Sequence, residues 1–411
     1  EPAMRTRVSA LHCMIPVSKA LRMISRETPK LGVERVVLED SIGRVLAENI
    51  VADSDLPPFD RSQMDGYAVK AADTMGAPIT LKLVGESAAG RGWRNVLKSG
   101  EAIRIMTGAS VPTGADAVQK LEVAREDGDS VTLLESTDVG KFIVPKGKEV
   151  KKGKTVLKAG ELITPANISI PAAFGYAKVK AAKQPRAAII STGTEIVDIK
   201  KKPGRDQIRN SNSIMLKALC EQAGAIATVY PNVGDDISDL RSQILDAVRN
   251  ADILVTTGGV SVGKYDLTKL ALKELGAEIF FERVALKPGK PTVFGRLKES
   301  LVFGLPGNPV SAAVTFYLFV RKAIAIMQGM QSSELEHASA ITSKAIKSTK
   351  DRDVYLPSAL EIIDDGRLIV EPVNWHGSSD FIGFSHADAL AVVPKGSDIE
   401  AGDVVSVLLL P

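Results

Sequence analysis

The stretch "DILVTTGGVSVGKYD", residues 252–266, ends an apolar run with two glycines and then supplies Lys264 and Asp266. A short apolar run that stops at glycine is typical of a buried strand followed by a loop. From residue 186 onward the chain repeats this order of apolar run, glycine-containing loop and segment with helical spacing. The repetition predicts a three-layer, doubly wound α/β domain, whose parallel sheet binds ligands at the carboxyl ends of its strands. The loop after residue 257 is therefore either a holder for an anionic ligand or a simple turn.

The rest of the chain predicts further domains, because 411 residues are too many for one core. We place the α/β domain at 185–330. Residues 53–144 alternate short apolar runs with Gly, Pro and Asp, which predicts a β-rich insertion. Residues 331–411 return to short strands and predict a small β-barrel. The segments 1–52 and 145–184 flank the insertion.

Composition narrows the class of protein. Lys and Arg total 52 against 49 Asp and Glu, so nucleic acid is not expected as a partner. Cys13 and Cys220 lie far apart without a CxxC spacing, which argues against a zinc ribbon or a disulfide-stapled domain. We find no run approaching the roughly 18 apolar residues of a membrane span, and no signal peptide. A cytoplasmic protein without a membrane partner is expected.

Four predicted strand ends combine glycine with hydroxyl or acidic residues: "STGTE" (191–195), "NVGDD" (232–236), "TTGGVSVGKYD" (256–266) and "GLPGNPVS" (304–311). Glycine lets a ligand approach the backbone, and the N–H groups at a helix start attract anions. Parallel strands end at one edge of a sheet, so these loops should bind a ligand together. Each loop alone would also suit an ordinary turn.

Three carboxylates follow these strands, namely Glu195, Asp235 and Asp266. Carboxylates in such positions hold magnesium through its waters while the ion binds phosphate oxygens. The alternative is that they cap helices, which applies most to Asp236 and Asp266 because both precede helical patterns.

Lysines form two further groups. Lys287 and Lys290 in "LKPGKPTVFG" are separated by a Pro-Gly turn and suit a dianion or oxyanion, unless they are merely exposed on the turn. Residues 141–158 hold seven lysines against one glutamate. There a solvated face is favoured over an anion site.

Several common catalytic sites are excluded by spacing. "GGVSVGK" has the wrong gap for a P-loop, and Tyr265 stands where that motif needs a hydroxyl residue of the Ser/Thr type. His12, His337, His376 and His386 fit no paired metal-ligand spacing. No Ser, His and Asp set suggests a hydrolase.

Taken as a set, "FDRSQMDGYAVK", "IRIMTGASVPTGADAV", "STGTE", "TTGGVSVGKYD", "LKPGKPTVFG" and "GLPGNPVSAAVTF" resemble one family. The chain is similar to the molybdopterin molybdenumtransferases, which include bacterial MoeA proteins and the gephyrin E domain, from about residue 16 to the end. The resemblance implies insertion of molybdate into adenylylated molybdopterin (molybdopterin-AMP), with release of AMP and dependence on Mg2+. It also implies a homodimer whose segments 1–52 and 145–184 form one elongated domain.

The resemblance also implies roles for individual residues. Asp65, Glu195 and Asp266 would be catalytic, and Glu195 and Asp266 would hold the metal. In a homodimer with its active site between subunits, Asp65 and Thr107 would face the α/β domain of the partner chain. The substrate-binding residues would be Thr107, Asp235, Gly258, Gly259, Ser261, Lys287, Lys290, Pro306, Pro309 and Ser378.

Two departures from the family pattern stand out. The chain has "GKE", with Lys148 and Glu149, where relatives commonly have a "GED"-like acid. Arg352 of "KDRDVYLPS" fits the pattern, but Pro357 stands where relatives often have a second arginine. The last domain could therefore bind the oxyanion more weakly or with different residues, and the role of Arg352 stays open.

Three alternatives remain. The molybdopterin adenylyltransferase that acts one step earlier would need only the α/β segment, and it is the expected upstream partner. A non-catalytic, gephyrin-like scaffold would bind without turnover. Tungstate could replace molybdate, because the two oxyanions are close in size and equal in charge.

Overall fold

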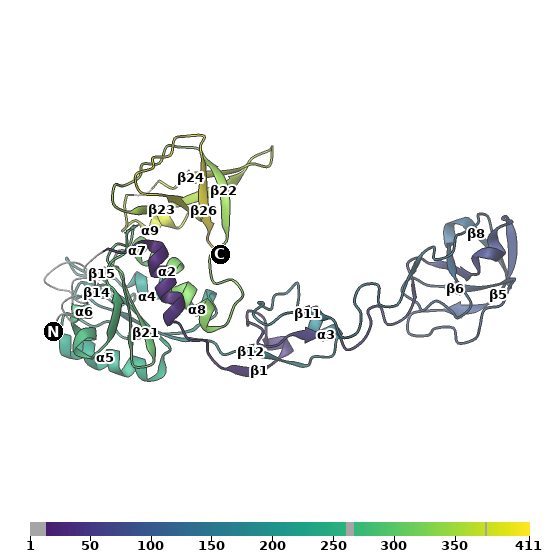
Figure 1. Cartoon of the computed structure of the whole chain (residues 1–411), viewed down its shortest axis with the longest axis horizontal. Coiled ribbons are helices and arrows are strands. Elements are labelled where there is room, and N and C mark those ends of the chain that lie inside the picture. Colours follow the sequence, from purple (N-terminus) through teal and green to yellow (C-terminus); the bar gives the residue numbers. More distant parts are fainter. Residues whose placement is uncertain (1–13, 260–266, 375) are drawn as a thin grey trace. The chain divides into compact units, whose positions relative to one another are not determined.

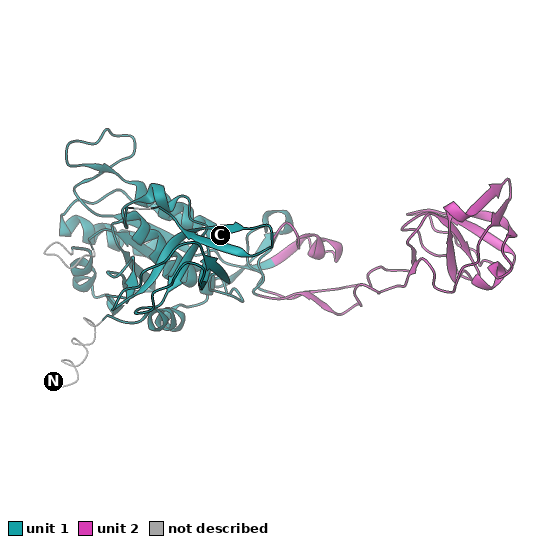
Figure 2. Cartoon of the chain, turned by 90° about the horizontal axis from the view of Figure 1, so that it is seen from above, with its two compact units in different colours: residues 1–47, 160–163, 180–411 teal, residues 48–159, 164–179 magenta. Residues whose placement is uncertain are grey.

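The computed structural model of the chain describes residues 14–259, 267–374 and 376–411. Two compact units can be separated (Figure 2). Unit 1 comprises residues 1–47, 160–163 and 180–411, and unit 2 comprises residues 48–159 and 164–179.

The centre of unit 1 is a six-stranded sheet with the order β16-β13-β17-β21-β20-β18. Its strand β21 is labelled in Figure 1. The first four strands are parallel, and β20 and β18 are antiparallel additions. The strand bounds are β13 Arg186–Ser191, β16 Ile226–Val229, β17 Ile253–Thr257, β18 Glu278–Phe281, β20 Val293–Leu297 and β21 Ser300–Leu305. The helices are α4 Ser211–Gln222, α5 Ile237–Asn250, α6 Leu267–Glu274, α7 Pro309–Thr315 and α8 Arg321–Met327.

Alternating strand residues explain why helices cover both faces of this sheet. In β17, Ile253 and Val255 enter the core that contains α4, α7 and α8. Leu254, between them, enters the opposite core with residues of α5 and α6. Successive side chains of a strand point to opposite faces, so an entirely apolar strand needs cover on both sides. The prediction of a three-layer α/β domain is confirmed.

One apolar helical segment, Pro309–Met327, is long and apolar enough to cross a membrane. It consists of α7, the π-helical turn η4 (Phe316–Val320) and α8. The sequence expectation missed it because Arg321 and Lys322 interrupt the apolar residues. However, 89% of its most apolar window is buried inside the structure, and the Lys322 ammonium pairs with Glu334 at 2.8 Å. It is a core helix of the α/β domain.

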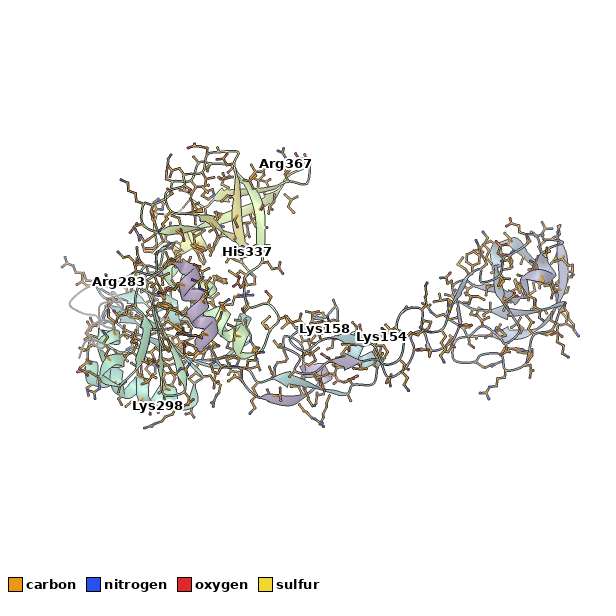
Figure 3. The ribbon with its side chains drawn as sticks, viewed as in Figure 1. Lys154, Lys158, Arg283, Lys298, His337 and Arg367 are labelled. Carbon is orange, nitrogen blue, oxygen red and sulfur yellow. The ribbon has the colours of Figure 1, made fainter. Side chains whose placement is uncertain are left out.

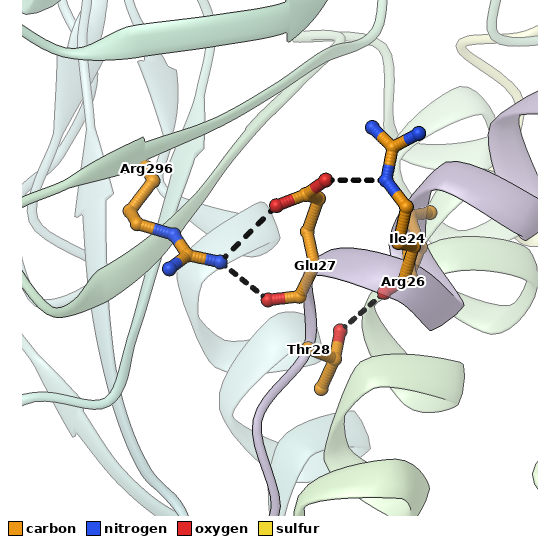
Figure 4. A network of polar contacts seen from close by, with 5 residues as sticks. All are labelled: Ile24, Arg26, Glu27, Thr28 and Arg296. Atoms are coloured by element: carbon orange, nitrogen blue, oxygen red, sulfur yellow. Dashed lines mark hydrogen bonds and ion pairs between the residues drawn. The ribbon is translucent and has the colours of Figure 1, made fainter.

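The N-terminal helix α2 (Val17–Glu27) packs on the same core through Val17, Ala20 and Ile24. Its end is fixed by Arg296 of β20, which donates to the Glu27 carbonyl at 2.6 Å and also contacts the Glu27 carboxylate at 3.4 Å (Figure 4). The Thr28 hydroxyl donates to the carbonyl of Ile24 at 2.6 Å and completes the turn. These bonds hold the start of the described chain against the sheet.

The C-terminal strands of unit 1 form a closed barrel. Its order is β23-β24-β22-β26-β25, and pairing of β25 with β23 closes the ring. The bounds are β22 His337–Thr342, β23 Asp353–Ile362, β24 Leu368–Pro372, β25 Ala389–Val393 and β26 Val404–Leu409, with the short helix α9 Phe381–Phe384 between β24 and β25. Strand β19 (Leu286–Lys287) of the preceding segment pairs with β23. The predicted β-barrel is confirmed.

Unit 2 contains the predicted β-rich insertion, a six-stranded sheet with the order β7-β4-β6-β5-β9-β8. Its strands are β4 Gly66–Val69, β5 Ile79–Ser87, β6 Glu101–Ile105, β7 Ala117–Lys120, β8 Ala124–Asp127 and β9 Ser130–Leu133. Two chain segments connect to it as a ribbon, in which β2 (Ile50–Val51) pairs with β11 (Thr155–Leu157) and β3 (Arg61–Ser62) pairs with β10 (Ile143–Val144). The lysines of 141–158 lie here and are exposed, with Lys154 and Lys158 labelled in Figure 3.

The remaining elements are short. They are β1 Val33–Val37, η1 Leu38–Asp40, η2 Ala71–Thr74, η3 Leu121–Val123, α3 Ser169–Ala173, β12 Lys178–Ala182, β14 Ile196–Val197 and β15 Ile208–Arg209.

Candidate functional site

The four strand-end loops of the α/β domain meet around one pocket of about 450 Å3, which we call the strand-end pocket. Register explains their convergence, because Ser191 pairs with Thr257 and Thr257 pairs with Leu305. The loops after β13, β17 and β21 therefore begin at the same level of the sheet. The pocket is lined by Thr192, Gly193, Glu195, Asp235, Gly258, Gly259, Leu267, Pro291, Pro306, Gly307 and Asn308.

Two glycines leave space that side chains would fill. Gly258 has a φ of +90°, and a Cβ there would lie 2.6 Å from the carbonyl oxygen of Thr192. Gly193 has a φ of +138°, and a Cβ there would lie 2.4 Å from a carboxylate oxygen of Glu195. L-residues rarely adopt such angles, so both positions need glycine. The Glu195 carboxylate is consequently folded over the loop that carries it.

A network of amide side chains lies among these loops, and sequence reasoning missed it. Asn212 of α4 donates to the Thr257 hydroxyl at 3.0 Å and to the carbonyl of Gly307 at 2.7 Å. Asn210 donates to the Ser191 hydroxyl at 2.7 Å, and this hydroxyl donates to Asn232 at 3.0 Å. The amides thus hold the ends of three parallel strands and the Gly307 loop in place.

The adjacent carboxylates of Asp235 and Asp236 have different surroundings: one lines the pocket and the other caps a helix. Asp236 caps α5 by accepting from the N–H of Asp239 at 2.9 Å. Asp235 lines the pocket and accepts from the Thr194 hydroxyl at 3.0 Å. Ser261 and Asp266 lie outside the described residues.

The donor set suits magnesium better than a transition metal. Within the described ranges 14–259, 267–374 and 376–411, no group of three or more His, Cys, Asp and Glu residues gathers for a metal. Glu195 and Asp235 do line one pocket. Mg2+ is usually held by one or two carboxylates together with waters and substrate phosphates, so these residues fit it.

The loop with the two candidate lysines is held firmly. The buried Thr292 hydroxyl donates to the carbonyl of Gly289 at 2.7 Å, and the N–H of Val284 donates to the carbonyl of Lys290 at 3.0 Å. Lys287 lines a second pocket of about 250 Å3 together with Lys344 and Lys347. The residue after Lys290, Pro291, lines the strand-end pocket. Lys287 and Lys290 therefore flank one rigid Pro-Gly turn, but Lys287 lines a different pocket from the one that Pro291 lines.

The remaining candidates of unit 1 lie near the start of α7 and in the barrel. Pro306 is buried and lines the strand-end pocket, and Pro309 is the first residue of α7. Ser378, from the barrel, accepts a hydrogen bond from Asn308 at 2.8 Å. Arg352 contacts Asp351 at 3.3 Å, and Pro357 lies within β23, where it pairs with Leu390.

In unit 2 the structure brings Asp65 and Thr107 together. The Asp65 carboxylate accepts from the N–H of Thr107 at 2.7 Å. Hydrogen bonds from the backbone and side chain of Thr107 lower the pKa of Asp65 below its ordinary value, so this exposed carboxyl stays ionised. Glu149, the departing residue of the ribbon, forms an ion pair with Arg61 at 3.1 Å.

Comparisons with known proteins cover nearly the whole chain. Three family models match, described as the MoeA N-terminal region (domain I and II) at residues 15–175, a probable molybdopterin binding domain at 188–325, and the MoeA C-terminal region (domain IV) at 339–410. The chain is 35% identical over 408 residues to the molybdopterin molybdenumtransferase of Staphylococcus aureus strain COL, covering 96% of this chain and 95% of that protein. It is also 35% identical to the protein of that name from Bacillus subtilis strain 168, covering 96% and 94% of the two chains.

Comparison with a solved structure gives the same family. A crystal structure of the molybdopterin biosynthesis MoeA protein from Pyrococcus horikoshii OT3 matches with a TM-score of 0.84 and 30% identity, covering 97% of this chain and 100% of that one. Sequence and fold are thus shared over all the domains described above. The chain belongs to the molybdopterin molybdenumtransferase (MoeA) family, a family of transferase enzymes in molybdenum cofactor biosynthesis.

Proposed function

We propose that the protein inserts molybdate into adenylylated molybdopterin and releases AMP and the finished molybdenum cofactor. The observation that carries the proposal is the strand-end pocket, in which four glycine-containing loops present two carboxylates, Glu195 and Asp235. An adenylylated pterin carries a phosphoanhydride, and backbone N–H groups with a carboxylate-held metal are suited to bind it. Membership of the family supports the same substrate.

Mg2+ would be held by Glu195 and Asp266, and Asp235 would contribute to substrate binding. When bound, the ion supplies positive charge to the phosphoanhydride oxygens and favours departure of AMP. The residues of the chain itself bind and orient the substrate. Glycines 258 and 259 allow close approach of the substrate to the backbone, and Asn212 keeps the Gly307 loop against β17.

Molybdate is a dianion, and it needs cations and hydrogen-bond donors near the pterin. We assign this role to Lys287 and Lys290 on their rigid turn and to the hydroxyl of Ser378. Arg352 is left without a role. A protein nucleophile is not required, since water or an oxyanion oxygen can attack the phosphoanhydride phosphorus to release AMP, while the two dithiolene sulfurs replace molybdate oxygens that leave as water.

We further infer a homodimer in which Asp65 and Thr107 of one subunit complete the strand-end pocket of the other. This inference is supported by the short hydrogen bond between Asp65 and Thr107 and by the ionised state of the Asp65 carboxyl. The expected location is the cytoplasm. The expected upstream partner is the enzyme that adenylylates molybdopterin.

The test is AMP release from adenylylated molybdopterin with Mg2+ and without ATP, in the presence or absence of molybdate or tungstate. Release that depends on the oxyanion is the expected result, and the two oxyanions are compared for preference. A requirement for ATP would favour the adenylyltransferase instead. Tight pterin binding with no release under any condition would favour a scaffold.

A further inference from the structure

Ser378 is joined to the start of α7 by two hydrogen bonds. The N–H of Val310 donates to the carbonyl oxygen of Ser378 at 3.0 Å. The side-chain amide of Asn308 donates to the Ser378 hydroxyl oxygen at 2.8 Å. Asn308 also lines the strand-end pocket. One asparagine therefore lies between the proposed pterin pocket and the barrel residue assigned to the oxyanion.

The side chain of Asn308 does not make the capping hydrogen bond that its position before α7 favours. Asn308 is the N-cap residue of α7, where an asparagine side chain normally accepts from an N–H of the first helical turn. Here it makes no such capping bond. The N–H of Val310, in that turn, is satisfied by Ser378 instead. The amide is thus diverted from the helix to the hydroxyl.

This contact keeps the Ser378 hydroxyl proton from pointing toward Asn308. Because the amide nitrogen of Asn308 donates, the Ser378 oxygen acts as the acceptor in this bond. The hydrogen of the Ser378 hydroxyl must then point elsewhere, and within the described residues this hydroxyl donates no hydrogen bond. A hydroxyl held in this way is ready to donate to an anion.

We propose that Asn308 is a positioning residue that orients the Ser378 hydroxyl as a hydrogen-bond donor to the tetrahedral oxyanion. The inference rests on the proposed function for the identity of the oxyanion. It adds a residue that acts through Ser378, and it couples the loop of the strand-end pocket to the barrel.

The test compares Asn308→Ala, Asn308→Asp, Ser378→Ala and the double variant Asn308→Ala with Ser378→Ala. Molybdate affinity is measured by equilibrium dialysis, and the half-saturating molybdate concentration is measured in AMP release. Losing one neutral hydrogen bond should raise both values about fivefold in Asn308→Ala. Asn308→Asp should raise them more, because the carboxylate would accept the Ser378 proton and repel the dianion. Asn95→Asp in an exposed bend of the insertion is the matched control for the charge change.

A purely structural role predicts the opposite order of effects. Asp caps helices about as well as Asn and much better than Ala, so Asn308→Asp would then be the milder change. Near-wild-type molybdate affinity in Asn308→Asp would overturn the inference. So would a full fivefold effect of Asn308→Ala in the Ser378→Ala background, because a residue acting through Ser378 should then add almost nothing.

Failure of the proposed function is recognised separately. If wild-type protein shows no oxyanion-dependent AMP release, the proposed reaction is wrong, whereas the dialysis measurement still decides whether Asn308 acts through Ser378. If the wild type releases AMP and Ser378→Ala weakens molybdate binding, but the Asn308 variants match the wild type, only the inference on Asn308 is wrong. Thermal unfolding of every variant confirms that each remains folded.

Discussion

The strand-end pocket of unit 1 and the Asp65–Thr107 pair of unit 2 both join residues that are far apart in the sequence, but by different means. In the pocket, parallel strands β13, β17 and β21 end together, so several loops meet at one edge. In the insertion, β4 and β6 are antiparallel, so the start of β4 lies beside the end of β6 and only two segments meet.

The difference bears on what each region can bind. The loops at the edge of the parallel sheet form a pocket of about 450 Å3, a volume that is typical of small-molecule binding pockets. The antiparallel pair presents one ionised carboxylate and one threonine on an exposed surface. The pair is too small to hold a pterin nucleotide alone, which favours its use as a contribution to another site.

The largest expected effect is on the pocket itself. Glu195→Gln should lower the rate of AMP release about a thousandfold, because loss of a carboxylate that would hold Mg2+ removes positive charge from the transition state, and losses of this kind cost this order of magnitude. Folding should not change, since the carboxylate lies over Gly193 at the pocket surface. Single-turnover AMP release and thermal unfolding are measured. Activity within a factor of about three of wild type would remove Glu195 from the reaction.

A backbone change in the insertion should destabilise unit 2 and leave the α/β sheet of unit 1 unchanged. A Cβ at Gly66 would lie 2.0 Å from the carbonyl oxygen of Gln119, so Gly66→Ala must push β4 away from β7. We expect a loss of about 3 kcal/mol of stability in unit 2. Hydrogen exchange should report lost protection in 66–69 and 117–120, with peptides of β13 and β17 unchanged. Equal loss in both regions would show that the two regions are not independent.

A smaller effect is expected for the carboxylate of the pair. Asp65→Asn should lower AMP release about thirtyfold, because Asn can still accept from the Thr107 N–H but lacks the charge. Asp65→Ala should be at least as slow. If Asp65→Asn keeps wild-type rates while Asp65→Ala does not, the carboxylate only holds the Thr107 loop.

The smallest effect concerns a buried ion cluster behind α6. Burial disfavours the charged form of Glu282, but hydrogen bonds and charges of Lys273 and Lys269, each at 3.1 Å, outweigh it and lower the pKa below the ordinary 4.5. A lowered folded-state pKa contributes stability above about pH 4.5, and this is lost as pH falls through the folded value. Glu282→Gln should therefore cost about 2 kcal/mol at pH 7 and less at pH 3.

Urea unfolding at both pH values measures this difference. Glu274→Gln on the same helix is the control, because its surface pair with Arg241 should contribute less than about 1 kcal/mol. A penalty for Glu282→Gln that is the same at pH 7 and pH 3 would contradict the assignment.

Local patterns in the sequence predicted the parallel sheet and the loops that meet at its edge, because strand and helix periodicities are read from neighbouring residues. The amide network was not predictable in this way. Asparagine at a helix start or in a loop usually marks a cap or turn, so Asn212 and Asn232 gave no separate signal. Their contacts depend on strand register. Asp65 and Thr107 were named only through resemblance to the family, since nothing local links residues 42 positions apart.

We propose that Asp65 from one subunit serves the strand-end pocket of the other. Two inactive variants, Asp65→Ala and Glu195→Ala, are mixed and allowed to exchange subunits before AMP release is measured. Half of the dimers should then be mixed, each with one intact site, and activity should recover to about a quarter of wild type. No recovery, with subunit exchange verified by mass spectrometry, would show that both residues serve a site within one chain and would contradict the account.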